Sequence, residues 1–177
     1  MAEPSLAIHT GQRFREGMVK MLLVTRALPD PAGKDRHGAY PPNNDQLNQE
    51  WVEIANGGAA PVSVNGVALF HYTFNAHCRR TGEDDLISLQ GTLQPRHSVR
   101  FHTGCGTPWD EGTIRHLYVG RENYAWNNRC GDTAVLRNGL GELLDWAAYD
   151  PAPPQGVVLN RVPGTNRLSP VASARTA

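Results

Sequence analysis

Histidine and cysteine residues that stand close together in the chain could hold a zinc ion. His102 is shortly followed by Cys105, His77 and Cys78 are adjacent, and Cys130 could supply a fourth ligand. Structural zinc needs four ligands that converge on a tetrahedron. Adjacent residues of a strand point to opposite faces, so His77 and Cys78 would not both reach one ion. Loop residues without a metal are the favoured interpretation, and zinc is the alternative.

A cysteine activated by a histidine could act as a nucleophile. Cys105 or Cys130 would be the thiolate, and His102 or His116 would be the base beside it. With three cysteines and seven histidines in the chain, such combinations arise by chance. The acidic pair at 84–85 is expected in a polar turn, as a solvated surface. The sequence therefore predicts no catalytic residue, no cofactor and no enzyme activity.

Oxygen ligands in the first long loop could suit a calcium ion. Asp30 and Asp35 flank Gly33 there, and oxygen-rich loops bind hard cations. Lys34 and Arg36 offset the negative charge, and the spacing matches no known calcium loop. Capping of turns is the favoured role of the two aspartates, with calcium as the alternative. No metal site is predicted.

The elements that must position these residues are short strands separated by turns. Alternation is clearest at 50–55, where Val52 and Ile54 share one face and Trp51 and Glu53 share the other. No amphipathic helix stands out, so the fold class is all-β, a sandwich of mostly antiparallel strands. We expect strands at 20–28, 50–55, 61–64, 67–74, 86–93, 98–102, 117–119, 133–136 and 142–149.

One domain accounts for all of these strands. We expect it to span residues 18–152, between an N-terminal tail at 1–17 and a flexible C-terminal tail at 153–177. Prolines after the last strand end the domain. Two long loops, at 29–49 and 103–116, are the candidate contact regions, because long loops inside a domain are often functional.

A corner of the sandwich is predicted where an aromatic residue precedes turn-forming residues and a strand. Trp126 fills the core, and Asn127, Asn128 and Asp132 hold the reversal through their side chains. A strand then leaves this corner. The residues that we expect to define the fold are Trp51, Trp126, Asn127, Asn128, Gly131 and Asp132.

Charge and cysteine content narrow the class of protein. Lys plus Arg and Asp plus Glu both total 17, so the net charge is zero and no global attraction to nucleic acid exists. The three cysteines cannot all pair within one chain, and the first residues lack a secretory signal. No segment reaches the ~18 apolar residues of a membrane span. We therefore expect a reduced, cytoplasmic protein with no membrane span.

An ordered set of segments resembles the lamin tail domain family, whose fold is an immunoglobulin-like β-sandwich. The resemblance covers roughly residues 20–150, about three quarters of the chain. Two positions depart from the family pattern. Val67 replaces an aromatic residue, which implies a core filled by Trp109 or Trp146, and Arg96 replaces a glycine, which implies either no positive φ or a strained turn. The segments that carry the resemblance are 28–35, 50–56, 62–69, 93–101, 126–136 and 141–149.

The resemblance implies a non-enzymatic interaction or scaffolding module without a cofactor. The chain has no heptad-rich rod and no room for a second domain, so we expect a stand-alone adaptor of bacterial type. The family also allows weak DNA contact through a basic face. Arg79 and Arg80, with Arg96 and Arg100 at another turn, make weak nucleic-acid binding the alternative function.

The partner surface is expected at loops and sheet edges. Trp109 follows a proline in a glycine-bounded loop and could anchor a protein partner, although cover of the core is an equal possibility. Exposed edges could add a strand from a partner or from a second copy of the chain. The residues predicted to contact a partner are Trp109, Asp30, Asp35, Arg79 and Arg80.

Overall fold

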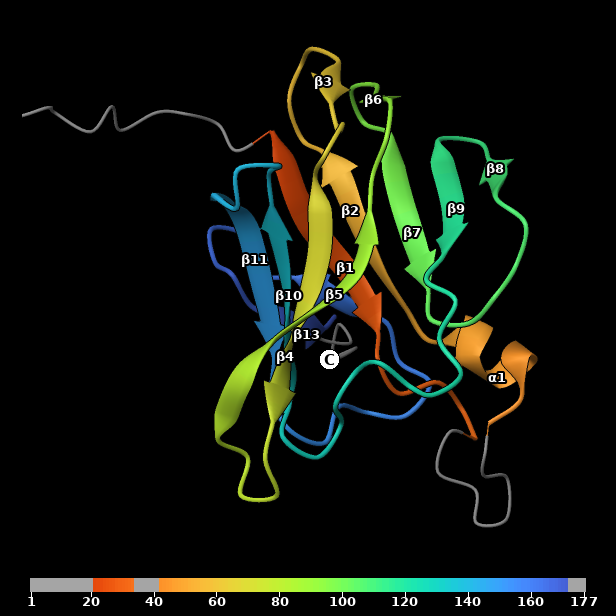
Figure 1. Cartoon of the computed structure of the whole chain (residues 1–177), viewed down its shortest axis with the longest axis vertical. Helices are drawn as coiled ribbons and strands as arrows, with labels where there is room; N and C mark the ends of the chain where they lie inside the picture. The colour runs from red at the N-terminus through yellow and green to blue at the C-terminus, as the bar shows by residue number, and fades with distance from the viewer. Residues whose placement is uncertain (1–20, 34–41, 172–177) are drawn as a thin grey trace, which may run out of the picture.

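Two β-sheets pack face to face in the computed structural model of the chain, which describes residues 21–33 and 42–171 (Figure 1). The strands of the larger sheet are β1 (Leu22–Leu28), β2 (Trp51–Asn56), β7 (Ser98–His102), β8 (Trp109–Glu111), β9 (Ile114–Tyr118), β12 (Leu159–Arg161) and β13 (Leu168–Pro170). Those of the smaller sheet are β4 (Ala68–Phe74), β5 (Arg80–Ser88), β10 (Asp132–Arg137) and β11 (Leu143–Tyr149). A two-stranded ribbon joins β3 (Val62–Ser63) to β6 (Thr92–Leu93), and a helix, α1 (Asn44–Gln49), precedes β2.

The order of the strands makes a two-layer sandwich. The larger sheet runs β13-β12-β1-β2-β7-β9-β8 and the smaller one runs β11-β10-β4-β5. The described neighbours are antiparallel, apart from β7 and β9, which run parallel. This arrangement confirms the expected all-β, immunoglobulin-like sandwich with mostly antiparallel strands.

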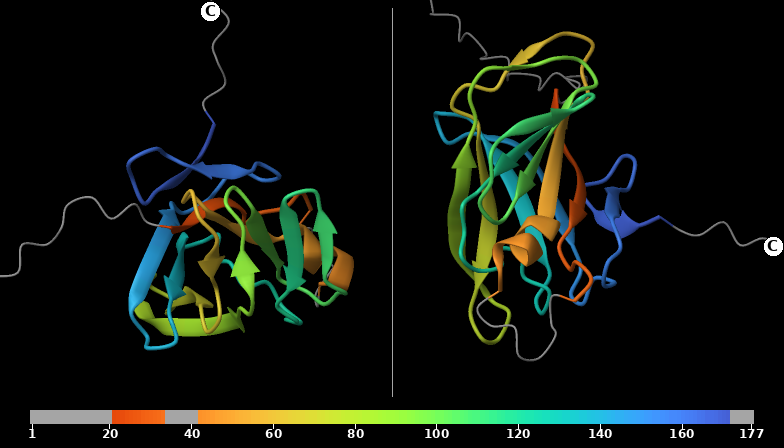
Figure 2. Two further views of the ribbon diagram at one scale, coloured as in Figure 1. Left: turned by 90° about the horizontal axis from the view of Figure 1, so that it is seen from above. Right: turned by 90° about the vertical axis from the view of Figure 1, so that its right-hand side faces the viewer.

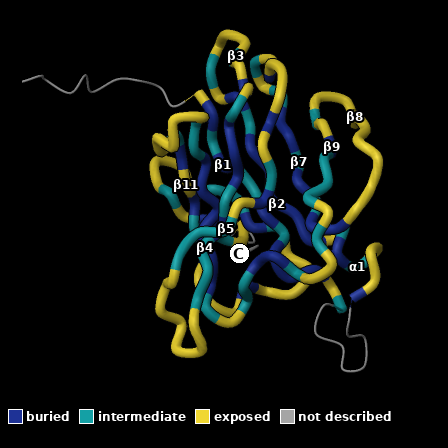
Figure 3. Tube along the Cα trace, in the orientation of Figure 1, coloured by how far each residue is buried: buried dark blue, intermediate teal, exposed yellow. Residues whose placement is uncertain are grey.

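The core lies between the two sheets, where the tube in Figure 3 is darkest. Each sheet turns alternate aliphatic side chains inward, as strand geometry requires. Trp126 is buried beside them and meets the His71 ring edge-on, with the ring centroids 5.7 Å apart. The innermost side chains of the core are Val24, Val52, Ile54, Leu69, Phe101, Leu136 and Leu159.

A bulge in β1 decides which of its side chains face the core. The pairing with β2 shifts register between Val24 and Arg26, so Thr25 is an extra residue. Val24 and Ala27 can therefore both be fully buried although they are not an even number of positions apart. The same shift turns Arg26 outward, opposite Glu53.

The predicted corner is centred on Asp132, a buried carboxylate. It accepts hydrogen bonds from the backbone N–H groups of Tyr72 (3.1 Å), Asn127 (3.1 Å) and Thr133 (2.7 Å). The Nδ1 atom of His71 lies 3.0 Å away and donates, because an ionised carboxylate can only accept. Asp132 thus joins β4, β10 and the turn before β10.

The neighbouring amides complete the corner in different ways. The Asn127 side-chain oxygen accepts from the Cys130 N–H (2.9 Å), and the Asn127 backbone carbonyl accepts from the Tyr149 hydroxyl (3.3 Å). Burial raises the pKa of Tyr149 well above its usual value, so this hydroxyl stays a donor. Asn128 holds the corner through its carbonyl, which accepts from the Ala152 N–H (2.7 Å), rather than through its side chain.

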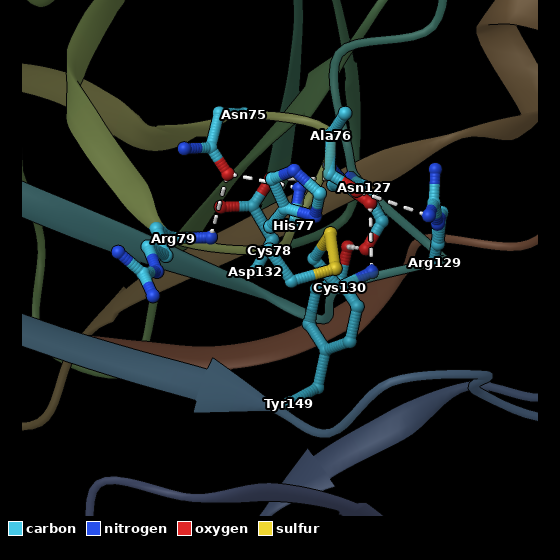
Figure 4. The surroundings of a disulfide bond; sticks show 10 residues. All are labelled: Asn75, Ala76, His77, Cys78, Arg79, Asn127, Arg129, Cys130, Asp132 and Tyr149. Atoms are coloured by element: carbon cyan, nitrogen blue, oxygen red, sulfur yellow. Dashed lines mark hydrogen bonds between the residues drawn. A yellow bond between two sulfur atoms is a disulfide. The ribbon is translucent and has the colours of Figure 1, made fainter.

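A disulfide between Cys78 and Cys130 ties the turn between β4 and β5 to this corner (Figure 4). The Asn75 side chain accepts two backbone hydrogen bonds that shape the turn. The expectation of three reduced cysteines is therefore wrong for two of them, because an odd count excludes complete pairing but not one bond. Cys105 is the free, exposed cysteine.

The β12–β13 hairpin extends the larger sheet beyond β1 and stands at the side of the sandwich (Figure 2). Leu159 and Leu168 from this hairpin are buried in the core. The prediction of a flexible tail over 153–177 is therefore wrong for the residues described up to 171. The two strands are short and separated by turn residues, so they show no alternation that the sequence could reveal.

A buried ion pair fastens this hairpin to both sheets. Asp145 of β11 has no exposed surface and accepts from the Arg161 guanidinium at 2.5 and 3.2 Å. The Val24 N–H donates to the same carboxylate at 2.9 Å, and the Val24 carbonyl accepts from Arg161 at 2.9 Å. One carboxylate therefore joins β1, β11 and β12.

The loop predicted at 29–49 contains helix α1. Asn43 caps the helix by accepting from the Gln46 N–H, and the Gln46 side chain accepts from the Asn43 N–H in return. Leu47 anchors the helix by burial. No helix in the described ranges is long and apolar enough to cross a membrane.

Two further expectations are corrected by the strands. Asp84 and Asp85 lie in β5 rather than in a polar turn, and Asp84 accepts from Arg121 at 2.6 Å. Trp109 lies in β8, not in an irregular loop. Neither Trp109 nor Trp146 fills space near Val67, because both are exposed.

Arg96 adopts a strained backbone conformation, which is one of the two alternatives expected for this turn. Its φ is +64°, a left-handed conformation that glycine adopts more easily. The backbone N–H of Arg96 donates to the Asn56 carbonyl at 3.1 Å, which fixes the turn.

Gly131 is required by both its conformation and its surroundings. Its φ is +70°, and a Cβ atom would lie 2.5 Å from the Tyr149 carbonyl oxygen. We expect Gly131→Ala to lower the free energy of unfolding by about 3 kcal/mol. Gly141→Ala is the matched control, with φ +79° and nothing within 4 Å of an added Cβ, and should cost about 1 kcal/mol. Urea unfolding measures both, and equal losses would contradict the close approach.

The hairpin pair makes a second prediction. Arg161→Met should destabilise the protein by about 3–5 kcal/mol, because it removes the charge that compensates buried Asp145. Arg167→Met is the control, since Arg167 and its partner Asp150 are both exposed, and should cost less than about 1 kcal/mol. Thermal and urea unfolding measure the loss of stability in each variant relative to the parent protein. A stable Arg161→Met protein would show that the hairpin does not depend on this pair.

Candidate functional site

A row of side chains crosses the outer face of the larger sheet from β12 to β8. Each member is the direct cross-strand neighbour of the next. Val52 and Ile54 of β2 face the core, so the residue between them faces outward with the rest of the row. The members of the row, in order, are Asn160, Arg26, Glu53, Arg100, His116 and Trp109.

Glu53 is the centre of this row and is buried, with 3% of its surface exposed. Arg26 donates to both of its oxygens at 2.8–3.0 Å, and Arg100 donates to Oε2 at 2.9 and 3.2 Å. The Arg100 guanidinium also covers the Trp51 ring, 4.1 Å from its centroid. Two guanidinium groups share one carboxylate, so one positive charge is left over.

A shallow hollow of about 450 Å³ lies beside the row. Arg96 on its wall is exposed and adds a further positive charge. Arg161, also on the wall, is engaged with Asp145, Asn166 and backbone carbonyls. Three arginines and one carboxylate line the hollow, so it is basic, which suits an anionic group.

Four rings make contact in series along β7, β9 and β8. Trp109 lies on His116 with centroids 4.1 Å apart and planes inclined by 17°. His116 and His102 lie edge to edge and nearly in one plane, with centroids 5.1 Å apart, and His102 stacks on Tyr118 at 5.2 Å. Gly106 packs so close to Tyr118 that a Cβ there would lie 2.4 Å from the ring. The series ends at solvent with Trp109, which is 47% exposed.

The two histidines of this series also form a hydrogen-bonded chain. His102 Nδ1 lies 2.6 Å from the Asn48 carbonyl oxygen, and His102 Nε2 lies 2.8 Å from His116 Nδ1. His116 Nε2 lies 3.3 Å from a Glu111 carboxylate oxygen. Burial lowers the pKa of His102, with smaller contributions from the nearby His116 and Arg100 and a partly opposing one from the Asn48 hydrogen bond.

The predicted contact residues do not form one surface. Trp109 is at the edge of the larger sheet, whereas Arg79 and Arg80 are exposed beside the turn between β4 and β5 of the smaller sheet. Arg80 lies 3.7 Å from the Tyr72 ring centroid and pairs with Glu83. These two arginines are therefore a separate basic patch.

Asp30 of the first loop does not extend this surface. Asp30 is buried, and its carbonyl accepts from the Gly156 N–H at 2.6 Å, so it acts in packing. Asp35 lies outside the described residues.

The sequence pointed to His102 and His116 as possible ligands or bases but not to their contact with each other. The parallel pairing of β7 with β9 brings them together, and no alternation pattern reveals it. Arg100 and His102 do alternate with core residues Val99 and Phe101, which was the available signal for a shared outer face.

The alternatives of metal binding and of catalysis by Cys130 gain no support from this geometry. Cys78 and Cys130 are bonded to each other, so neither offers a thiolate. In the part of the chain that the structure describes, no group of three His, Cys, Asp or Glu side chains is arranged to hold a metal ion. His102 and His116 bond to each other through the ring atoms that face one another.

Comparison with known proteins places the chain in a family. No curated protein matches the sequence. The sequence model of the Lamin Tail Domain matches residues 22–151, a segment that begins at β1 and ends just after β11. Domains of this family are immunoglobulin-like, non-enzymatic interaction modules. The chain belongs to the lamin tail domain family.

Proposed function

We propose that this chain is a non-enzymatic interaction module that binds a protein partner at the β8 edge of the larger sheet. The observation that carries the proposal is Trp109, whose ring is 47% exposed yet is held in place on His116. An aromatic ring that is already fixed loses little entropy when a partner covers it. Trp109 is thus suited to anchor a partner side chain or backbone.

Strand addition supplies the rest of the contact in this proposal. β8 is the last strand of its sheet, and its three residues are exposed. An edge strand can pair with an extended segment of a partner or with a second copy of the chain. The longer edge strand β5 is less suited, because Glu83, Asp84 and Asp85 place three acids in it.

Weak nucleic-acid binding is the second candidate function. The observation that favours it is the uncompensated charge of the Arg26–Glu53–Arg100 row, with exposed Arg96 beside the same hollow. Phosphate groups bind such clusters, with an affinity that falls as salt rises. Of the two arginine pairs that the sequence offered, Arg96 and Arg100 belong to this surface, which is more concentrated than the separate patch of Arg79 and Arg80.

The disulfide bears on the compartment in which the protein works. The sequence predicts a cytoplasmic location. The Cys78–Cys130 bond favours an oxidising compartment over that location, since reducing conditions in the cytosol keep most thiols free.

The partner proposal is tested by affinity capture with the full chain as bait. Trp109→Ala should remove most of a captured protein, whereas Trp146→Ala, which truncates an exposed tryptophan on the other sheet, should leave capture unchanged. Both variants should keep the unfolding transition of the parent protein, because both rings are at the surface. Treatment with nuclease should not change the result.

Three outcomes would contradict the partner proposal. Equal capture by the parent and Trp109→Ala proteins would exclude the β8 edge. Loss of folded structure in Trp109→Ala would make Trp109 a core residue. Capture that disappears with nuclease would favour the nucleic-acid function. Arg96→Ala should then weaken the binding of nucleic acid.

A further inference from the structure

The hydrogen-bonded chain through His102 and His116 begins and ends at acceptors. At one end is the backbone carbonyl of Asn48 in α1, and at the other is the Glu111 carboxylate of β8. Between them lie four ring nitrogen atoms and three hydrogen bonds. Each hydrogen bond needs one proton, so the complete chain needs three protons on the two rings.

Two neutral imidazoles carry two protons, one on each ring. The complete chain therefore holds one proton more than the neutral pair. With two protons, one of the three contacts must bring two lone pairs together. With four protons, the two ring atoms that face each other at 2.8 Å would both carry hydrogen. One proton above neutrality is the state that satisfies all three contacts.

We propose that His102 and His116 form a one-proton site that holds Trp109 and Glu111 in place when it is protonated and releases them when it is not. The proposal rests on the proposed function, because it assigns a control to the same Trp109 surface. The ligand of the site is the proton itself.

The position of the extra proton follows from the acceptors at the two ends of the chain together with burial. The Asn48 carbonyl and the Glu111 carboxylate both accept, so in the complete chain His102 Nδ1 and His116 Nε2 carry hydrogen, and the third proton lies between His102 Nε2 and His116 Nδ1. Burial lowers the pKa of His102, so the charge rests on His116, which donates from both of its nitrogen atoms. The proton that is gained and lost is the one on His116 Nε2, because the exposed Glu111 side chain can turn to water while the hydrogen bond between the two rings is kept.

Among the residues that the structure describes, few other charged or titratable groups face the pair. Arg100 is the neighbour from β7 in the same row, and Tyr118 of β9 stacks on His102. Glu111 approaches from β8, and α1 contributes the Asn48 carbonyl. Arg100 is engaged with Glu53 and opposes protonation of the pair, so Glu111 is the group that favours it.

Protonation changes how Trp109 and Glu111 are held. An imidazolium beneath the indole ring adds a cation–π attraction to the stacking at 4.1 Å. When the proton leaves, the Nε2 lone pair faces a carboxylate, and Glu111, whose side chain is 61% exposed, can turn to water. The anchor is thus ordered at mildly acidic pH and looser at higher pH.

The experiment is a pH titration of the full chain, without a partner, by NMR of the histidine ring nitrogens and the Trp109 indole N–H. As pH falls from about 8 to about 5, the range in which histidine titrates, the pair should take up one proton, at His116. His102 should keep its hydrogen on Nδ1 throughout. The Trp109 indole signal should move with the same midpoint.

A matched pair of variants separates this site from a general effect of charge. Glu111→Gln removes the carboxylate that faces the proton and should lower the midpoint by about one pH unit, a tenfold weaker proton affinity. Asp110→Asn removes the adjacent exposed charge, which pairs with Arg115 and not with the histidines, and should shift the midpoint by less than a third of that amount. Unfolding curves of both variants check that the fold, including the β8–β9 hairpin, is intact.

The proposal is overturned if both rings titrate independently, if neither takes up a proton in this range, or if the two variants shift the midpoint equally. These outcomes do not depend on the partner. Capture that requires Trp109 at every pH would uphold the proposed function and remove its control. A one-proton titration, together with capture that does not depend on Trp109, would uphold the proton site and contradict the proposed function.

Discussion

Glu53, a carboxylate with almost no exposed surface, lies between the guanidinium groups of Arg26 and Arg100, and the outer face of the larger sheet depends on this contact. A buried charge is tolerated when it is paired and hydrogen-bonded. Glu53 has two charged partners, and both of its oxygens accept hydrogen bonds from them. The contact orders β1, β2 and β7 relative to one another. Arg100 then stands beside His116, so the row passes from an ion pair to the stacked rings that end at Trp109.

Buried carboxylates hold other junctions of the sandwich in the same way. Asp132 collects donors from β4, β10 and the corner, and Asp145 joins β1, β11 and β12. Glu50, also fully buried, accepts from the Thr103 hydroxyl and the Ala125 N–H and so connects two loops below the larger sheet. These buried carboxylates accept hydrogen bonds from backbone N–H groups that are not bonded to a neighbouring strand. They also make these junctions sensitive to the loss of a single partner.

The fold could be predicted from the sequence where strands alternate and turns are marked by glycine, asparagine or proline, as in β2 and β7. The C-terminal hairpin could not, because β12 and β13 are three residues each and depend on contacts with β1 and Asp145 that are distant in sequence. The disulfide was hidden by an odd cysteine count. For the candidate site, exposure of Trp109 was one of two open alternatives. Its support by His116 arises from the antiparallel pairing of β8 with β9. The contact of His116 with His102 arises from the parallel pairing of β7 with β9, which no local pattern encodes.

The most direct test of the account is where a bound partner lies on the sandwich. Hydrogen exchange of the backbone amides, measured for the full chain with and without its captured partner, locates that surface. The account predicts added protection in β8 and β9, around Trp109 and His116, with the smaller sheet unchanged. Protection confined to the smaller sheet, around Trp146 or beside Arg79 and Arg80, would contradict it.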